Sequence, residues 1–219
     1  MRHAGGAAGC VAAALLVSGA PARAQPVAPT PAVIYELGGK FDRSFNQAAW
    51  QGAERWKAGT GRNYLEFEIV NAAQREQAAM RLVERGARPV VAVGFPQAAT
   101  IAKVARAHPQ VPFAIIDAVV ELPNVQSFVY REHEGSFLAG MLAAMASRSG
   151  KVGFVGAMDI PLVRRFACGF EQGARHANPK VSVSTSLIGN TPAAWTDPAR
   201  GAELTKAQVA QGVDVVFAA

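Results

Sequence analysis

The residues best suited to bind a ligand lie in one short segment, 38–47, whose sequence is GGKFDRSFNQ. Two glycines turn the chain, Ser44 and the glutamine three residues later have the spacing of a capping box, and a helix is predicted to begin at Phe45. Helix N-terminal amides, the Asp42 carboxylate, the Asn46 amide and an aromatic ring together suit a small polar ligand with a flat face. The alternative is a well-capped helix with Phe45 in the core.

The elements around this segment alternate between strand and helix patterns. Apolar and β-branched runs predict strands at 32–37, 65–70, 89–93, 113–116, 125–130, 151–155, 181–187 and 213–218. Amphipathic repeats between most of them predict helices at 45–57, 73–85, 97–107, 134–147, 162–176 and 198–211. This alternation favours an α/β fold of parallel sheets with helices on both faces.

One pair of predicted strands has no helix between them. The strands at 113–116 and 125–130 are joined only by residues 119–123 and their immediate neighbours, which carry the sequence VVELP. We therefore expect the chain to begin leaving one sheet for a second at this break. Residues 130–132 then become a candidate hinge.

Functional side chains in parallel sheets lie just past the carboxyl ends of the strands. In this sequence those positions hold Glu36, Phe95, Asp117, Asp159 and Gly189. Carboxylates can accept hydrogen bonds from sugar hydroxyls or from a heterocycle, and the two rings of Phe45 and Phe95 could stack on a flat group. Alternatively, Asp117 and Asp159 only cap the turns that follow their strands.

The sequence lacks the common signatures of an enzyme. It contains no Walker phosphate loop, no GxGxxG after a strand and no GxSxG nucleophile elbow. His108, His133 and His176 fall at the ends of predicted helices and do not have the spacing of metal ligands. We therefore expect no catalytic residue, no metal and no cofactor.

The first 24 residues are interpreted as a secretory signal peptide. An apolar run follows Arg2, and 22–24 (ARA) supplies the small residues that a signal peptidase reads, so cleavage is predicted after Ala24. No apolar core precedes Cys10, so lipoprotein processing is not expected. A proline-rich lead-in at 25–31 follows. These features predict a periplasmic protein.

The composition agrees with export. The 219 residues carry a formal net charge of +6, to which the predicted signal contributes Arg2 and Arg23, and this mild excess does not indicate a nucleic-acid-binding protein. Removal of Cys10 leaves Cys168 as a lone cysteine, which we expect to be buried and unreactive. Beyond the signal, no apolar run approaches the length of a membrane span.

Six motifs occur in a family-specific order. They are GGKFDRSFNQ (38–47), VGF (93–95), AIID (114–117), EHEGSFLAG (132–140), KVGFVGAMDIP (151–161) and WTDPARG (195–201). With these motifs the chain resembles the BMP family, the basic membrane proteins that are substrate-binding proteins of ABC importers and include purine nucleoside receptors. The resemblance covers residues 32–219. It implies a type I periplasmic-binding fold, in which two doubly wound parallel-sheet lobes close on a ligand.

The resemblance also implies roles for individual residues. Phe45 matches the aromatic that stacks on the base, and Asn46 belongs to the same motif. Asp117 matches the acid that holds the edge of the base. Glu36 stands where many relatives have aspartate, near the ribose, and Gly189 falls in the loop of the second lobe that approaches the sugar.

By the same resemblance, lobe 1 spans 32–130 and lobe 2 spans 131–219. Relatives continue past the last strand, so the second lobe is expected to be incomplete. The implied function is that of a monomeric solute-binding protein that carries a nucleoside to an ABC permease in the inner membrane. Two alternatives are a periplasmic sensing domain of a signalling system and a nucleoside-processing enzyme.

Overall fold

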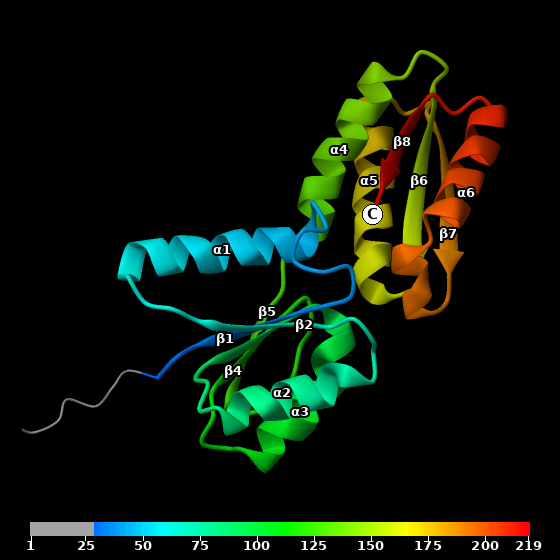
Figure 1. The fold of residues 1–219 in the computed structure, drawn as a ribbon. Coiled ribbons are helices and arrows are strands. Elements are labelled where there is room, and N and C mark those ends of the chain that lie inside the picture. The colour runs from blue at the N-terminus through cyan, green and yellow to red at the C-terminus, as the bar shows by residue number, and fades with distance from the viewer. Residues whose placement is uncertain (1–28) are drawn as a thin grey trace, which may run out of the picture.

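The computed structural model describes residues 29–219, which form two α/β lobes (Figure 1). The signal peptide predicted at 1–24 and most of the lead-in predicted at 25–31 lie outside the described residues. Within the described part of the chain, no helix combines the length and the apolar character needed to cross a membrane.

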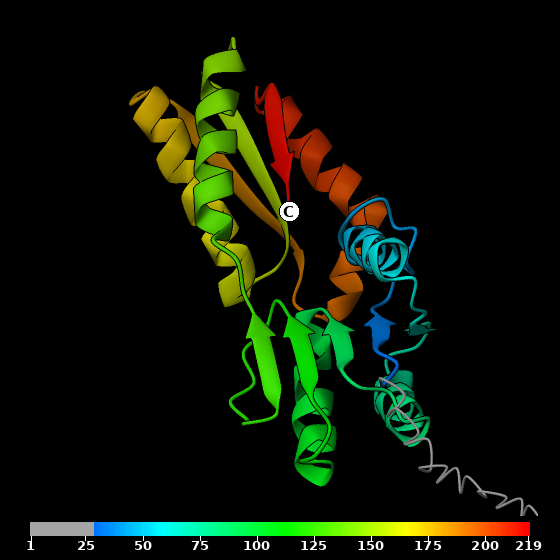
Figure 2. The same ribbon diagram turned by 90° about the vertical axis from the view of Figure 1, so that its left-hand side faces the viewer.

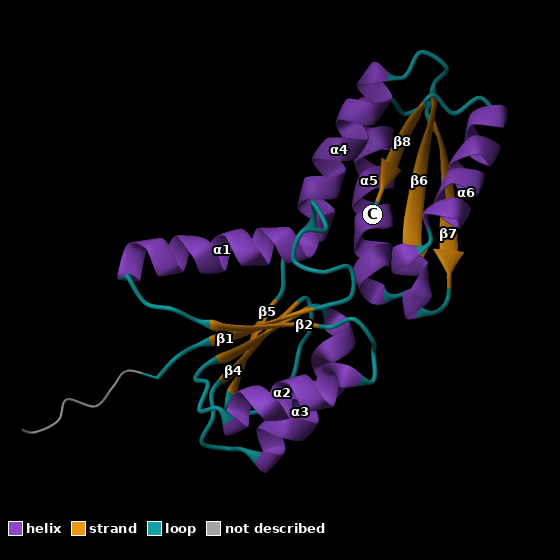
Figure 3. Cartoon of the chain, in the orientation of Figure 1, coloured by secondary structure: helices purple, strands orange, loops and turns teal. Residues whose placement is uncertain are grey.

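The first lobe is built on a five-stranded parallel sheet of order β2-β1-β3-β4-β5. Its strands are β1 (Ala32–Tyr35), β2 (Leu65–Glu68), β3 (Val90–Val93), β4 (Phe113–Ile116) and β5 (Val125–Phe128). Its helices are α1 (Phe45–Thr60), the 3-10 turn η1 (Phe95–Gln97), α2 (Gln74–Glu84) and α3 (Ala98–Ala107). Helix α1 covers one face of the sheet, and α2 and α3 cover the other (Figure 3).

Strand β1 lies inside this sheet and shows how the sequence produces the two cores. All four of its residues are buried. Ala32 and Ile34 join the larger core with α2 and α3, whereas Val33 and Tyr35 point to the opposite face and pack with α1. Because successive side chains of a strand alternate between faces, a continuous apolar run is what a strand covered on both sides requires.

The second lobe has a three-stranded parallel sheet of order β7-β6-β8. Its strands are β6 (Lys151–Met158), β7 (Ser182–Gly189) and β8 (Val215–Ala218), and its helices are α4 (Glu132–Ala146), α5 (Pro161–Ala177), the 3-10 turn η2 (Pro192–Thr196) and α6 (Pro198–Ala210). Helices α4 and α5 share one core with the sheet, and Gln208 of α6 bonds to β6 and β7. In Figure 2 the strands of lobe 1 point their carboxyl ends at the second lobe.

Three glycines allow α4 and α5 to pack closely. A Cβ atom built on Gly140 would lie 2.0 Å from the carbonyl oxygen of Phe170, and one on Gly173 would lie 1.9 Å from that of Phe137. A Cβ atom built on Gly169 would lie 2.3 Å from the carbonyl oxygen of His133 in α4. Side chains larger than hydrogen therefore cannot enter this helix pair without moving the two backbones apart.

The elements follow the sequence predictions closely, but the point at which the chain leaves the first sheet was predicted too early. Strand β5 pairs in parallel with β4, so the chain leaves this sheet only after Phe128. The connecting loop stays on lobe 1 because Val120 is buried in its core and the Val120 amide donates to Ser127 Oγ at 3.0 Å. Residues 129–131 then lead into α4.

The expectation for Cys168 was also wrong, because this residue is exposed. The buried stripe of α5 contains Val163, Phe170 and Ala174. At about 100° per residue, position 168 is rotated well away from that stripe, so its side chain faces outward.

The capping box predicted at Ser44 does not form. Ser44 makes no side-chain cap bond, whereas the Asp42 carboxylate accepts hydrogen bonds from the backbone amides of Ser44 (2.8 Å), Asn46 (3.0 Å) and Gln47 (3.1 Å). Because the Asp42 carboxylate already accepts hydrogen bonds from these amides, the Ser44 hydroxyl is not needed as a cap. The amides of Asn46 and Gln47 at the start of α1 are therefore occupied by Asp42 and are not available to a ligand.

We expect Asp42→Ala to lower the free energy of unfolding by about 1–2 kcal/mol, because it leaves amides of the first turn without an acceptor. Ser44→Ala is the matched control and should change it by less than about 0.5 kcal/mol. Urea denaturation followed by circular dichroism measures both. A larger loss for Ser44→Ala than for Asp42→Ala would contradict the assignment of the cap.

Candidate ligand-binding cleft

A cleft of about 550 Å³ lies between the two lobes. This volume is within the range of small-molecule sites. Six residues predicted from the sequence line it, namely Glu36, Asp42, Phe45, Asn46, Phe95 and Asp117. The second lobe contributes, among others, Phe166, Trp195 and the end of β8. The cleft therefore forms where the carboxyl ends of the lobe 1 strands meet lobe 2.

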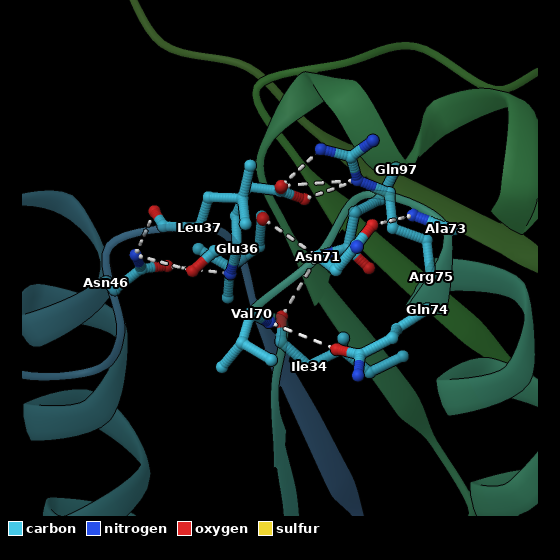
Figure 4. A network of polar contacts seen from close by, with 11 residues as sticks. Ile34, Glu36, Leu37, Asn46, Val70, Asn71, Ala73, Gln74, Arg75 and Gln97 are labelled. Carbon is cyan, nitrogen blue, oxygen red and sulfur yellow. Dashed lines mark hydrogen bonds and ion pairs between the residues drawn. The ribbon is translucent and has the colours of Figure 1, made fainter. Parts of the chain in front are cut away.

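Two of the predicted residues are committed to the protein backbone. Asn46 is only 2% exposed; its Oδ1 accepts from the Glu36 amide at 3.0 Å, and its Nδ2 donates to the carbonyls of Glu36 (3.1 Å) and Leu37 (3.4 Å), as Figure 4 shows. Asp42 caps α1 as described above. Asn46 therefore fixes the end of β1 against α1, and Asp42 fixes the first turn of α1. Both residues shape the wall of the cleft and have few polar atoms left for a ligand.

Glu36 has a partner that sequence reasoning missed. Arg75, in the first turn of α2, donates from Nε to both carboxylate oxygens (3.2 and 3.0 Å) and from Nη2 to Oε1 (2.5 Å). The two side chains are only 13% and 10% exposed, and both residues line the cleft. A buried carboxylate is stable only when a cation or other donors pair with it, so the position of Glu36 after a buried strand already indicated a positively charged partner. The sequence did not show which residue this was, because 39 positions separate Glu36 from Arg75.

Aromatic rings from both lobes surround the cleft. Phe45 is 36% exposed, and so keeps an open ring face instead of being part of the core. Phe95 lies 6.0 Å, between ring centroids, from Trp195 of the second lobe, and it also packs against the apolar cluster of Ala157 and its neighbours. Trp195 was not predicted as a site residue. The feature that could have identified it is that it is an aromatic residue in the WTDPARG motif, in the segment that follows β7.

Asp117 follows β4 in a left-handed backbone conformation, with φ of 64°. Burial raises the pKa of its carboxyl to about 6, and the negative charge of Glu132 adds to this effect, while Arg165 works against it. Arg165 is bound to Glu132, with Nε to Oε2 at 2.8 Å and Nη2 to Oε1 at 3.3 Å. Burial disfavours the negative charge of Glu132, but the hydrogen bonds from Arg165 outweigh this effect and hold the pKa of Glu132 below its usual range.

The raised pKa of Asp117 has a consequence for stability. A native pKa above the unfolded value means that the carboxyl's stabilising contribution is fully present below about pH 3.8 and is lost as the pH rises through about 6. Asp117→Asn removes the charge and keeps a side chain that tolerates a left-handed backbone.

We therefore expect the variant to match the wild type at about pH 3.5 and to be more stable by about 1–2 kcal/mol at about pH 8, less than the full shift implies because water reaches the group. Urea unfolding across this range is the measurement. A constant difference at all pH values would contradict the raised pKa.

The remaining two predicted residues are not among those that line the cleft. Asp159 is exposed and binds Arg164, with Nε to Oδ1 at 2.5 Å and Nη2 to Oδ2 at 2.8 Å. Gly189 ends β7, and a Cβ built on it would meet Ala194 at 3.5 Å. In residues 29–219 no group of three acidic, histidine or cysteine side chains could hold a metal ion.

Comparisons with known proteins agree with this geometry. A sequence model of the Bmp family, described as ABC transporter substrate-binding protein PnrA-like, matches residues 32–219. The chain is 30% identical over 193 residues to the ABC transporter nucleoside-binding protein BmpA of Lactococcus lactis, which covers 85% of this chain and 53% of that protein. The chain thus spans about half the length of the curated relatives it matches.

Solved structures show the same architecture. An ABC transporter solute-binding protein from Aeropyrum pernix is similar with a TM-score of 0.73 and 27% identity, over 87% of this chain and 55% of that one. Another from Conexibacter woesei has a TM-score of 0.67 and 26% identity, over 86% of this chain and 63% of that one. Each similarity therefore extends over both lobes of this chain.

Proposed function

Because this chain belongs to the Bmp family of PnrA-like ABC transporter substrate-binding proteins, we propose that it forms the solute-binding part of an ABC importer and that its ligand is a purine nucleoside. Its α/β lobes have the type I periplasmic-binding fold of the similar solute-binding structures. The observation that carries the proposal is a cleft between the lobes that combines open aromatic rings with a carboxyl group at Asp117.

The rings and the carboxyl group suit the two chemical features of a purine. The exposed face of Phe45 can stack on a flat base, and Trp195 offers a second ring from the opposite lobe. Asp117 in its charged form accepts hydrogen bonds from ring or exocyclic N–H groups, and in its protonated form it also donates one. The name of the Lactococcus relative, which states nucleoside binding, points to the same ligand class.

Binding between lobes implies a mechanism of closure. In the described chain, residues 129–131 lead from the last strand of lobe 1 into the first helix of lobe 2. A ligand that makes better contacts when both lobes touch it shifts the open–closed equilibrium toward the closed state. The closed form would then be recognised by a permease in the inner membrane, and the protein would act as a monomer in the periplasm.

Isothermal titration with adenosine, guanosine and inosine tests the ligand class. We expect saturable binding of at least one nucleoside, no binding of free ribose, and no appearance of free base on prolonged incubation. Release of base would support an enzyme in place of a transport protein. Failure of all nucleosides to bind to the exported protein would overturn the ligand assignment while leaving family membership intact.

A further inference from the structure

The pair formed by Glu36 and Arg75 changes the hydrogen-bonding character of one end of the cleft. Both oxygens of the Glu36 carboxylate already accept hydrogen bonds from Arg75, at 2.5 to 3.2 Å (Figure 4). The side chain of Glu36 is 10% exposed, and the residue's own amide and carbonyl are bound to Asn46. Little acceptor capacity therefore remains at Glu36 for a ligand.

Arg75, in contrast, has N–H groups that Glu36 does not use. Its guanidinium carries five N–H groups, and Glu36 uses the Nε edge and Nη2. Within residues 29–219 no acceptor is bound to Nη1, and this nitrogen is not fully buried. Since Arg75 lines the cleft, the group presented at this end is a cationic donor.

The opposite end of the cleft has the complementary character. Asp117 follows β4, Glu36 follows β1, and strand β3 separates these two strands in the sheet. With strands about 4.8 Å apart, the two ends are separated by about 10 Å, roughly the length of a nucleoside. A carboxyl group at one end and a guanidinium at the other would orient a ligand whose two ends differ in the same way.

We propose that Arg75, and not Glu36, makes the ligand contact at this end, and that the ligand group bound there acts as a hydrogen-bond acceptor. This inference rests on the proposed nucleoside function and places a sugar oxygen against the guanidinium. Arg75 is then a specificity-determining residue that disfavours groups which only donate hydrogen bonds or carry positive charge. Glu36 is a positioning residue that holds the guanidinium in place.

Amino-sugar nucleosides are the discriminating probes. A hydroxyl both donates and accepts, whereas a protonated amine only donates, so the 2′-, 3′- and 5′-amino-deoxyadenosines each remove the acceptor at one position. At a pH at least one unit below the pKa of the amine under test, so that the amine is protonated, we expect at least one of them to bind about tenfold or more weakly than adenosine, the scale of a hydrogen bond to a charged group.

Substitution of Arg75 should reverse this preference. In Arg75→Met the carboxylate of Glu36 is released, so the affected amine should bind at least as well as adenosine. Arg81→Met, on the exposed face of the same helix and away from the cleft, is the matched control and should keep the wild-type order. If Arg75→Met does not fold, the double variant Glu36→Gln/Arg75→Met removes both charges together, and the tenfold penalty should disappear in it.

The outcomes separate the two proposals. A wild type that binds adenosine but prefers the amines, or a penalty that persists without the guanidinium, overturns the role of Arg75 and leaves the nucleoside assignment standing. Equal weakening of adenosine and all amines in Arg75→Met means that the pair is only structural, which also overturns it. A wild type that binds none of these compounds removes the nucleoside assignment, and this inference with it.

Discussion

Gly173→Ala is expected to unfold the second lobe or to lower its free energy of unfolding by more than about 3 kcal/mol, because the added methyl group would overlap the backbone of α4. The new Cβ would lie 1.9 Å from the carbonyl oxygen of Phe137 and 2.6 Å from the carbonyl carbon of the same residue. Neither neighbour is a flexible side chain. Relief requires α4 and α5 to separate, which would open the core that contains Ala143 and Phe170.

The matched control is Gly135→Ala in the other helix of the pair. A Cβ atom at Gly135 meets nothing within 4 Å, so the gain in helix propensity should raise the free energy of unfolding by up to about 1 kcal/mol. Urea denaturation monitored by circular dichroism compares the two variants. Equal stability of both would show that the helices tolerate a wider spacing than the structure implies.

Phe45→Ala is expected to weaken nucleoside binding by about 1–3 kcal/mol, or roughly 5- to 150-fold, the range of base–aromatic stacking. The ring lines the cleft and is 36% exposed, so its removal takes away a ligand surface and little of the core. The melting temperature without ligand should change only slightly. Titration calorimetry with adenosine measures the loss directly.

Phe41→Ala provides the control, since it removes the same kind of ring four residues earlier, in the loop before α1. Phe41 is 62% exposed, packs edge-on against Trp50 with centroids 5.0 Å apart, and is not among the residues that line the cleft. Its removal should leave affinity within about twofold, as expected for a surface substitution away from the site. Equal losses for the two variants, or none for Phe45→Ala, would mean that Phe45 does not stack on the ligand.

The order and type of the main elements could be predicted from the sequence because their signals are local. The run at Ala32–Tyr35 and the amphipathic repeat from Phe45 require only neighbouring residues to be recognised. Placement of Glu36 and Asp117 at the cleft followed from one general rule, that the carboxyl ends of parallel strands meet at one edge. The buried state of Asn46 could not be predicted in the same way, because its partners are backbone groups that follow β1, about ten residues earlier in the chain.

Only the tertiary structure decided which side chains meet. Even over a few residues the backbone matters: Arg43, between Asp42 and α1, is left-handed with φ of 58°, and Asp42 instead of Ser44 accepts the amides of α1. Arg75 meets Glu36 because the crossover through β2 places the start of α2 beside the end of β1, and Trp195 meets Phe95 because the two lobes face each other. Sequence periodicity shows which face of an element is apolar, but it does not specify the distance between side chains on different elements, and the chemistry of this cleft depends on those distances.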